Sequence, residues 1–286
     1  MAEYIKTFIT AIVSGLTAPL PVSSAAHFNF FSNVVGIAGD EKRMALYYYA
    51  FMLAFSLVIF ITYRKIYIGT VKSLFISKKN TEAYNNSMPY RKVSANLGVS
   101  IIPTLILFIP VSKEKLLIDL FDSFLDTTSL LLTGFACIIT ACVLVIALWY
   151  TRKTNNEGST ADKKNTLRFS FYQLPCYIIP GFSHIAAGSS NLLISDVKIK
   201  TFASELYVYL APSLFIVSAV KVIKAVADGI LFDPVSLIVG VIGFGVAAKL
   251  VMVLVSKFNL RRLFGLFSAY SAAFGIFIAL VSFFLN

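Results

Sequence analysis

The sequence predicts an all-α integral membrane protein made of two inverted-topology repeats, each with one re-entrant helical hairpin and three transmembrane helices. The first observation is composition: 58% of the 286 residues are apolar and 14% are charged, with a mean hydropathy of +0.80. Soluble domains are about 45–50% apolar and about 25% charged. The second observation is the length of the apolar segments, and the third is a polar interruption inside two of them.

Six apolar segments are long enough to cross a bilayer, which takes about 20 mostly apolar residues in a helix. The net charge of +11 is carried mainly by the loops between them, so it gives no reason to expect a nucleic-acid partner. The predicted transmembrane helices cover residues 44–63, 93–111, 129–150, 203–224, 234–255 and 263–285.

Two further apolar stretches, 4–36 and 168–195, are broken near the middle by Pro, Ser and His. Each half is too short to span, and irregular backbone is tolerated at membrane depth only where protein or a wet cavity surrounds it. We therefore predict that each stretch is a re-entrant hairpin. The alternative is eight ordinary spans, two of them kinked at Pro. The interrupting residues are Pro21, Ser24, His27, Pro180, Ser183 and His184.

Loop charges predict how the chain is oriented. Residues 64–92 hold seven Lys and Arg against one acidic residue, whereas residues 112–128 hold two Lys against four acids. By the positive-inside rule the first of these loops is cytoplasmic. Three crossings follow the first hairpin, so the second half of the chain is inverted relative to the first. The predicted repeats are 1–150 and 168–286, joined by a cytoplasmic linker at 151–167, and both termini lie outside.

The two interruptions are suited to binding an anion. Ser is a favourable N-cap, so Ser24 and Ser183 can each restart a helix after the Pro three residues earlier. A helix N-terminus presents unpaired N–H groups and a positive dipole end, which together favour phosphate. The only two histidines, His27 and His184, lie in the same segments. A protonated His would strengthen phosphate binding, and a neutral one could act as base or nucleophile.

Plainer roles for these residues stay open. A Ser in a membrane helix often bonds the carbonyl of the preceding turn, and a lone His can simply bridge two helices. Gly240, Gly243 and Gly245 lie within an apolar span and predict close helix packing, not a nucleotide site. The run Tyr47–Tyr49 lies near the start of a span and predicts interfacial aromatic residues. The three cysteines lie in apolar segments without metal-ligand spacing and are predicted to be reduced thiols.

The segment Gly15–Ser24 together with His27 resembles the first signature of the undecaprenyl-diphosphate phosphatases, the bacitracin-resistance family. Pro180–Ser183 is similar to the start of their second signature, and Met44–Ile66 and Arg261–Tyr270 resemble further family segments. The resemblance implies a protein of the bacterial cytoplasmic membrane with inverted repeats. It also implies removal of the terminal phosphate from undecaprenyl diphosphate, which recycles the lipid carrier of peptidoglycan synthesis.

The resemblance implies a site as well, and this chain departs from it. The family has acidic residues where this chain has Ser14 and Ala18, and an Arg where it has His184. The divalent cation used by the family, Mg²⁺ or Ca²⁺, therefore lacks its ligands, and no metal site is predicted. The residues implied for catalysis are His27, Ser24 and His184, and those implied for phosphate binding are Ser23, Ser24, Ser183 and Gly181.

Three functions remain open from the sequence. The first is a divergent undecaprenyl-diphosphate phosphatase whose hydrolysis is weakened or lost, because a phosphoryl transfer needs charge neutralisation that the missing residues would supply. The second is a flippase or transporter that binds undecaprenyl phosphate without hydrolysing it. The third is a non-catalytic paralogue. All three give the protein a polyprenyl phosphate or diphosphate partner in the membrane, and a homodimer is compatible with each.

Overall fold

The computed structural model describes residues 2–37, 41–112, 115–124, 129–151, 158–255, 257–258 and 260–285. Within these ranges the chain forms helices and short connections, with no strand longer than an isolated bridge. The prediction of an all-α integral membrane protein is confirmed. The helices are α1 (Glu3–Thr17), α2 (Ser24–Val35), α3 (Glu41–Thr62), α4 (Arg64–Leu74), α5 (Thr81–Leu105), η1 (Ile106–Phe108), α6 (Leu117–Phe124), α7 (Leu130–Thr151), α8 (Lys163–Ile178), α9 (His184–Ile194), α10 (Ile199–Ala227), α11 (Pro234–Val255) and α12 (Leu260–Leu285).

Six helices are long and apolar enough to cross a membrane, counting only the residues that the structure describes. They are α3, α5 with η1, α7, α10, α11 and α12, and they correspond to the six predicted segments. The largest difference is at α5, which begins at Thr81 instead of near residue 93. Asn80 caps this helix by accepting a hydrogen bond from the Ala83 N–H, so the polar residues 81–92 extend it beyond the apolar part.

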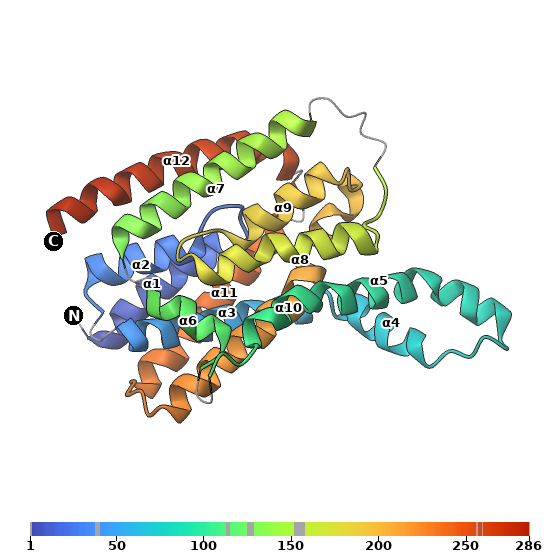
Figure 1. The fold of residues 1–286 in the computed structure, drawn as a ribbon, viewed down its shortest axis with the longest axis horizontal. Coiled ribbons are helices and arrows are strands. Elements are labelled where there is room, and N and C mark those ends of the chain that lie inside the picture. The colour runs from blue at the N-terminus through green and yellow to red at the C-terminus, as the bar shows by residue number, and fades with distance from the viewer. Residues whose placement is uncertain are drawn as a thin grey trace.

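Both interrupted stretches form pairs of short helices. The helices α1, α2, α8 and α9 have 15, 12, 16 and 11 residues, each fewer than the roughly 20 that a span needs. The two members of each pair pack against each other. In Figure 1, α1 begins at the end of the molecule where both termini lie, whereas α8 begins near the opposite end. The two turns, 18–23 and 179–183, meet inside the bundle, where the Ser183 hydroxyl donates to the Val22 carbonyl at 2.8 Å.

Each hairpin is held by a helix from the other half of the chain. The first helix of each pair packs on a full-length helix: α1 lies on α11, and α8 lies on α5. The full-length helices also pair between halves, α3 with α10 and α7 with α12. The two halves are therefore interlocked and share one core.

Small residues let α1 and α11 approach closely. A methyl group at Gly15 would lie 2.5 Å from the Phe244 carbonyl oxygen, and one at Gly243 would lie 2.7 Å from the Phe8 ring. Neither position therefore has room for a side chain. The prediction of close helix packing is confirmed for Gly240 and Gly243 but not for Gly245, where a methyl group would come no closer than 3.8 Å to Val58.

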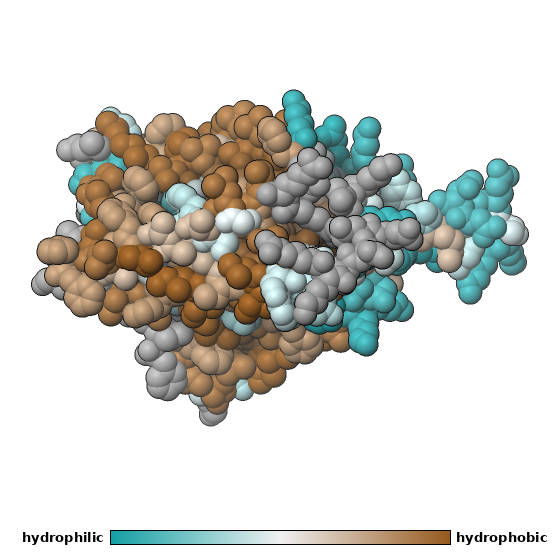
Figure 2. All heavy atoms as spheres, turned by 90° about the horizontal axis from the view of Figure 1, so that it is seen from above, coloured by the Kyte–Doolittle hydropathy of each residue, from teal (hydrophilic) through white to brown (hydrophobic). Residues whose placement is uncertain are grey.

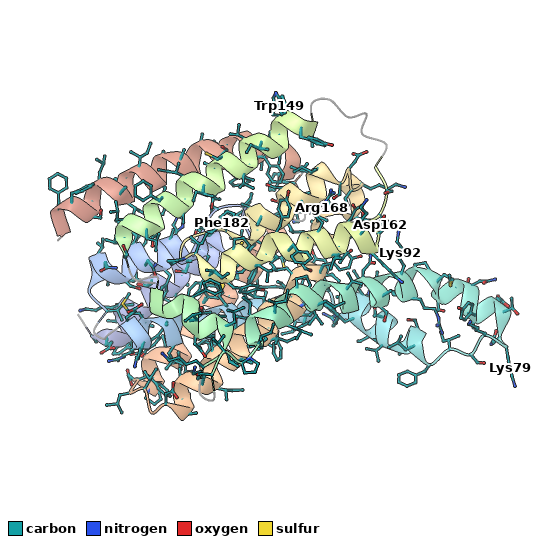
Figure 3. The ribbon with its side chains drawn as sticks, viewed as in Figure 1. Lys79, Lys92, Trp149, Asp162, Arg168 and Phe182 are labelled. Atoms are coloured by element: carbon teal, nitrogen blue, oxygen red, sulfur yellow. The ribbon has the colours of Figure 1, made fainter. Side chains whose placement is uncertain are left out.

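The surface separates into an apolar band and a charged end. Figure 2 shows apolar side chains over most of the visible face, and hydrophilic side chains gathered at one end and on a projection beyond it. That projection is the α4–α5 pair, which extends from the bundle in Figure 1. Lys79, Lys92, Asp162 and Arg168 all lie toward this end in Figure 3. The described residues of the loops predicted to be cytoplasmic thus lie at one end, opposite the two termini.

Candidate functional site

Two helix N-termini are capped by serine where the hairpins turn. The Ser183 Oγ accepts a hydrogen bond from the Ala186 N–H at 3.2 Å, so Ser183 caps α9 as predicted. In the first hairpin the cap is Ser23, whose Oγ accepts from the Ala26 N–H at 3.0 Å. The prediction that Ser24 is the cap is wrong by one residue, because Ser24 is the first residue of α2.

The serine hydroxyls also tie the two turns to the surrounding helices. Ser24 Oγ donates to the Ser14 carbonyl at 2.9 Å, near the end of α1. Ser183 Oγ donates to Val22, and the Ser183 N–H donates to the Thr140 hydroxyl at 3.3 Å on α7. These hydroxyl protons are directed to backbone carbonyls, so a bound phosphate would have to replace Val22 or Ser14 as their acceptor.

A small void lies where the turns meet, and we call it the tip cavity. Its volume is about 20 Å³, enough for roughly one water molecule and too small for a diphosphate. Three of the residues singled out from the sequence line it together: Ser24, Ser183 and His184. Ala18, where the family has an acidic residue, lines it as well. The lining residues are Ala18, Val22, Ser24, Ala25, Tyr48, Met52, Phe55, Phe182, Ser183, His184, Ile185 and Leu214.

His184 is held as a single tautomer in the wall of this cavity. Gln173 Nε2 donates to the His184 carbonyl at 3.0 Å, so Gln173 Oε1 faces the ring and lies 2.9 Å from His184 Nδ1. Because an amide oxygen only accepts, Nδ1 carries a hydrogen, and in the neutral ring Nε2 keeps its lone pair. The ring also packs on Tyr177, with centroids 4.5 Å apart. Gln173 therefore orients the imidazole.

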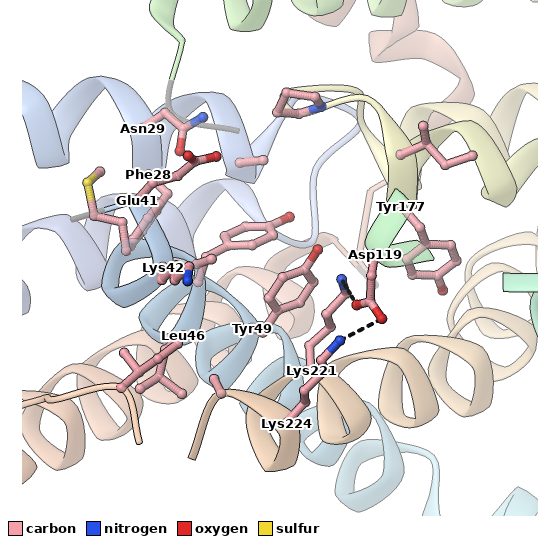
Figure 4. A pocket seen from close by; sticks show the side chains of 18 of the residues that line it. Phe28, Asn29, Glu41, Lys42, Leu46, Tyr49, Asp119, Tyr177, Lys221 and Lys224 are labelled. Atoms are coloured by element: carbon pink, nitrogen blue, oxygen red, sulfur yellow. Dashed lines mark hydrogen bonds and ion pairs between the residues drawn. The ribbon is translucent and has the colours of Figure 1, made fainter. Parts of the chain in front are cut away.

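A larger cavity, which we call the charged pocket, adjoins the tip cavity. Its volume is about 340 Å³, and Figure 4 shows Asp119 facing Lys221 and Lys224 within it. Ala25 and Tyr48 line both cavities and so lie between them. The charged residues of its lining are Glu41, Lys42, Asp119, Lys221, Lys224 and Asp228, and its apolar residues include Phe28, Met44, Ile178 and Ile179.

Two lysines share one carboxylate in this pocket. Lys224 Nζ lies 2.6 Å from Asp119 Oδ2, which also accepts the Leu116 N–H at 2.9 Å, and Lys221 Nζ lies 3.5 Å from Oδ1. Burial raises the pKa of Asp119, but the bonds from Lys224 and Leu116 and the charge of Lys221 outweigh it, so the pKa lies below its usual value. Asp119 is therefore ionised at neutral pH and pairs with both lysines.

His27 lies apart from both cavities. It is 2% exposed and lines neither the tip cavity nor the charged pocket. Its Nδ1 lies 2.6 Å from the Ser23 carbonyl, which only accepts, so Nδ1 donates and Nε2 accepts from the Tyr270 hydroxyl at 2.6 Å. Phe274 stacks on the ring with centroids 4.2 Å apart. His27 thus joins the start of α2 to α12.

Gly181 has a conformational role at the second turn. Its φ of +90° lies in the region that favours glycine, and a methyl group there would lie 3.0 Å from the Thr133 carbonyl oxygen. Gly181 also lines the charged pocket. The positive φ and the close approach to Thr133 explain why residue 181 is a glycine. A contact between Gly181 and phosphate remains a prediction.

The residues near the tip do not fit a divalent cation. Ser14 Oγ donates to the Thr10 carbonyl at 2.7 Å, and Ala18 presents only a methyl group to the tip cavity. Divalent cations of the Mg²⁺ and Ca²⁺ type prefer several oxygen ligands, carboxylates above all. Among the described residues, no group of three or more His, Cys, Asp and Glu side chains lies close enough to hold a metal ion.

Several residues of this region were missed by the sequence analysis. The Tyr47–Tyr49 run is not an interfacial belt: Tyr47 is 1% exposed, and Tyr48 separates the two cavities. Gln173 orients His184 without any pattern in the sequence that marks it. Lys221 did carry a signal, since a lysine within an apolar span is costly and marks a functional position.

The chain is similar over almost its whole length to one protein family. A model of the family described as bacitracin resistance protein BacA matches residues 7–277. Undecaprenyl-diphosphatase of Pseudomonas putida (strain W619) is 28% identical over 282 residues, covering 96% of this chain and 92% of that protein. Undecaprenyl-diphosphatase 2 of Clostridium acetobutylicum is 23% identical, with 97% and 95% covered, and undecaprenyl-diphosphatase of Bacteroides fragilis (strain NCTC 9343) is 26% identical, with 98% of each covered.

Proposed function

The chain belongs to the bacitracin resistance protein BacA family, and from this premise we propose that it acts on the diphosphate head group of undecaprenyl diphosphate or a related polyprenyl lipid. The relatives at 23–28% identity are named for that activity. The observation that carries the proposal is the meeting of two serine-capped helix N-termini at one cavity. Such ends present N–H groups and positive dipole ends to an anion without needing a charged side chain.

The residues at the tip take distinct roles in this proposal. Ser23 and Ser183, together with the first-turn N–H groups of α2 and α9, bind phosphate oxygens. Ser24 and His184 line the cavity at the first position of their helices, where they can donate to or accept from the transferred group. His27 is a positioning residue, because its Nδ1 hydrogen bond holds the Ser23 carbonyl at the start of α2.

Hydrolysis is proposed to be weak relative to the named relatives. The chemical step must neutralise charge on the transferred phosphoryl group. Among the described residues the tip cavity has no carboxylate in its lining, and Nδ1 of His184 is directed to Gln173 instead of the cavity. Removing one preorganised electrostatic group commonly costs about 10²–10³ in rate, and groups within one site are not additive.

The two halves of the chain are proposed to be inverted repeats around this site. The hairpins enter from opposite ends in Figure 1, and α1 packs on α11 as α8 packs on α5. In such folds, broken helices meet near the middle of the bilayer and form the binding site. We place the end with the α4–α5 projection in the cytoplasm, because the basic loops lie there.

The test is phosphate release from undecaprenyl diphosphate by the full-length protein in detergent, with and without Mg²⁺ or Ca²⁺. The variant Ser14→Glu/Ala18→Glu/His184→Arg restores charge at the tip and should raise the rate at least about tenfold, because one such group is worth more than that. The matched control is Ser14→Gln/Ala18→Gln/His184→Gln, which adds similar bulk without charge and should not raise it.

The outcome decides between the proposed phosphatase and the two other functions. A charged variant that elutes as a folded protein yet releases no more phosphate than its control contradicts a weakened phosphatase. Retained binding of undecaprenyl phosphate together with its transfer across vesicles would then favour a flippase. Retained binding without transfer would favour a non-catalytic paralogue.

A further inference from the structure

A lysine lies on the lipid-facing side of a transmembrane helix. Lys249 falls within α11, which is one of the six helices long and apolar enough to cross a membrane. The neighbours of Lys249 on the same side of α11 are Ile242, Val246 and Val253, and all three are exposed. Exposed apolar side chains of such a helix contact lipid. A charge among them is costly, so Lys249 is a candidate for a functional position.

The amino group of Lys249 reaches the end of α3. Its Nζ donates to the Thr62 hydroxyl at 2.8 Å, and this hydroxyl donates in turn to the Val58 carbonyl at 2.6 Å. Among the described residues, Lys249 makes this hydrogen bond and no ion pair with a carboxylate. An ammonium group has three N–H donors, so it can also bind an anion from outside the protein.

Two more cations lie at the same end of α3. Arg64 is the first residue of α4, and its Nη1 donates to the Ile61 carbonyl at 3.3 Å. Lys65 follows it and is exposed. Residues 42–81 and 234–286 contain no Asp or Glu. Neither α4 nor α11 can therefore supply a carboxylate to these cations, and α3 has one only as its first residue, at its opposite end.

The acids of the neighbouring helices are placed elsewhere. The main helices packed on α3, α4 and α11 are α1, α5 and α10, and each has one acidic residue. Glu3 of α1 pairs with Arg43 at the start of α3, and Glu205 of α10 accepts the Ala161 N–H at 2.8 Å. Glu82 of α5 lies on the projection that leaves the bundle in Figure 1. Arg64, Lys65 and Lys249, which we call the basic cluster, thus have no carboxylate partner among the described residues.

We propose that the basic cluster binds the head group of an anionic phospholipid, in the leaflet at the end where the α4–α5 projection leaves the bundle. Lys249 and Arg64 both reach the last residues of α3, so one phosphate can accept from both. The acyl chains lie on exposed apolar side chains of the two helices beside the cluster, Leu57 and Ile61 of α3 and Val246 and Leu250 of α11. Basic residues between membrane helices bind acidic head groups in this way.

Charge complementarity selects the kind of lipid. A zwitterionic head group brings its own cation, which three basic side chains without a carboxylate partner repel, whereas a head group with net negative charge is attracted. A bound lipid would also hold α3 and α11 together at this end. Because α11 packs on α1, the same contact supports the helix that leads into the first turn.

The test is binding of phosphatidylglycerol and phosphatidylcholine to the full-length protein in detergent, counted by native mass spectrometry. Phosphatidylglycerol should bind more tightly. Lys249→Gln and Arg64→Gln should each weaken its binding about fivefold, the usual effect of one basic residue near an anionic lipid surface. Lys249→Arg keeps the charge and should retain the affinity. The matched control is Lys79→Gln, which removes an exposed lysine at the far end of the projection in Figure 3 and should have no effect.

Two results would overturn the inference directly: equal affinity for the two lipids, or equal effects of Lys249→Gln and Lys79→Gln. Full displacement of phosphatidylglycerol by inorganic phosphate would also overturn it, because the site would then recognise free phosphate instead of a lipid. Arg64→Gln changes an exposed residue on a different helix, so it tests the site even if Lys249→Gln fails to fold. Neither lipid carries a diphosphate, so the result is independent of the proposed function, which phosphate release tests separately.

Discussion

The two histidines look equivalent in the sequence but have different surroundings in the folded protein. Ser24 and His184 are each the first residue of a helix and both line the tip cavity. His27 is three residues further along α2, and its ring contacts Tyr270 and Phe274 of α12 and lines neither cavity. One imidazole lines a cavity, and the other joins the start of α2 to α12.

This difference gives a prediction for the partner of His27. Tyr270→Phe removes the hydroxyl that donates to the buried Nε2, and an unsatisfied buried acceptor costs about 1–3 kcal/mol. The variant should therefore unfold at a lower temperature in detergent. Tyr150→Phe is the matched control, since Tyr150 is 47% exposed against 44% for Tyr270. Equal unfolding temperatures for the two variants would contradict the assigned hydrogen bond.

At the scale of elements, the hairpins depend on where their half-helices stop and restart. Serine at the N-cap restarts α2 and α9. In the second hairpin, Gly181 has a positive φ, which allows the chain to turn before Phe182. Each short helix is stabilised by a neighbour from the other half, because isolated helices of this length are marginal. Each hairpin therefore depends both on its turn residues and on the helix of the other half that packs against it.

Gly181 allows this to be tested. Gly181→Ala should lower the unfolding temperature by more than Gly229→Ala. Both residues have positive φ, +90° and +72°, which costs an L-residue about 1–2 kcal/mol. Only at Gly181 does a methyl group also meet the backbone, at the Thr133 carbonyl, whereas the space around Gly229 is open. Equal losses in the two variants would show that the contact between the second turn and α7 is unimportant.

At the scale of the whole molecule, the halves share one core and the two ends of the bundle differ. The basic projection α4–α5 lies at one end and both termini lie at the other (Figure 1). The charged pocket is lined by α6, the C-terminal part of α10 and the start of α3, all near the end with the termini. The orientation proposed above, with the basic end in the cytoplasm, puts the pocket on the outer side of the membrane.

The orientation can be measured directly in cells. A reporter that is active only when exported should be active when it is fused after Asn286 and inactive when it is inserted after Lys79. The physical reason is the retention of Lys- and Arg-rich loops on the cytoplasmic side. Matching signals from one compartment at both positions would contradict the arrangement of the ends, and reversed signals would contradict the orientation.

The sequence by itself determined the class of the protein, its six long helices and the two places where helices break, because apolar length and the Pro–Ser patterns are local properties of the chain. It also located the serine-capped turns to within one residue. The tertiary structure decided which side chains meet. His184 lines the tip cavity, His27 of α2 contacts Tyr270 of α12, and Asp119 meets Lys221 and Lys224 in one pocket. The last group comes from helices about 100 residues apart, and such contacts follow from packing across the bundle, which no local pattern records.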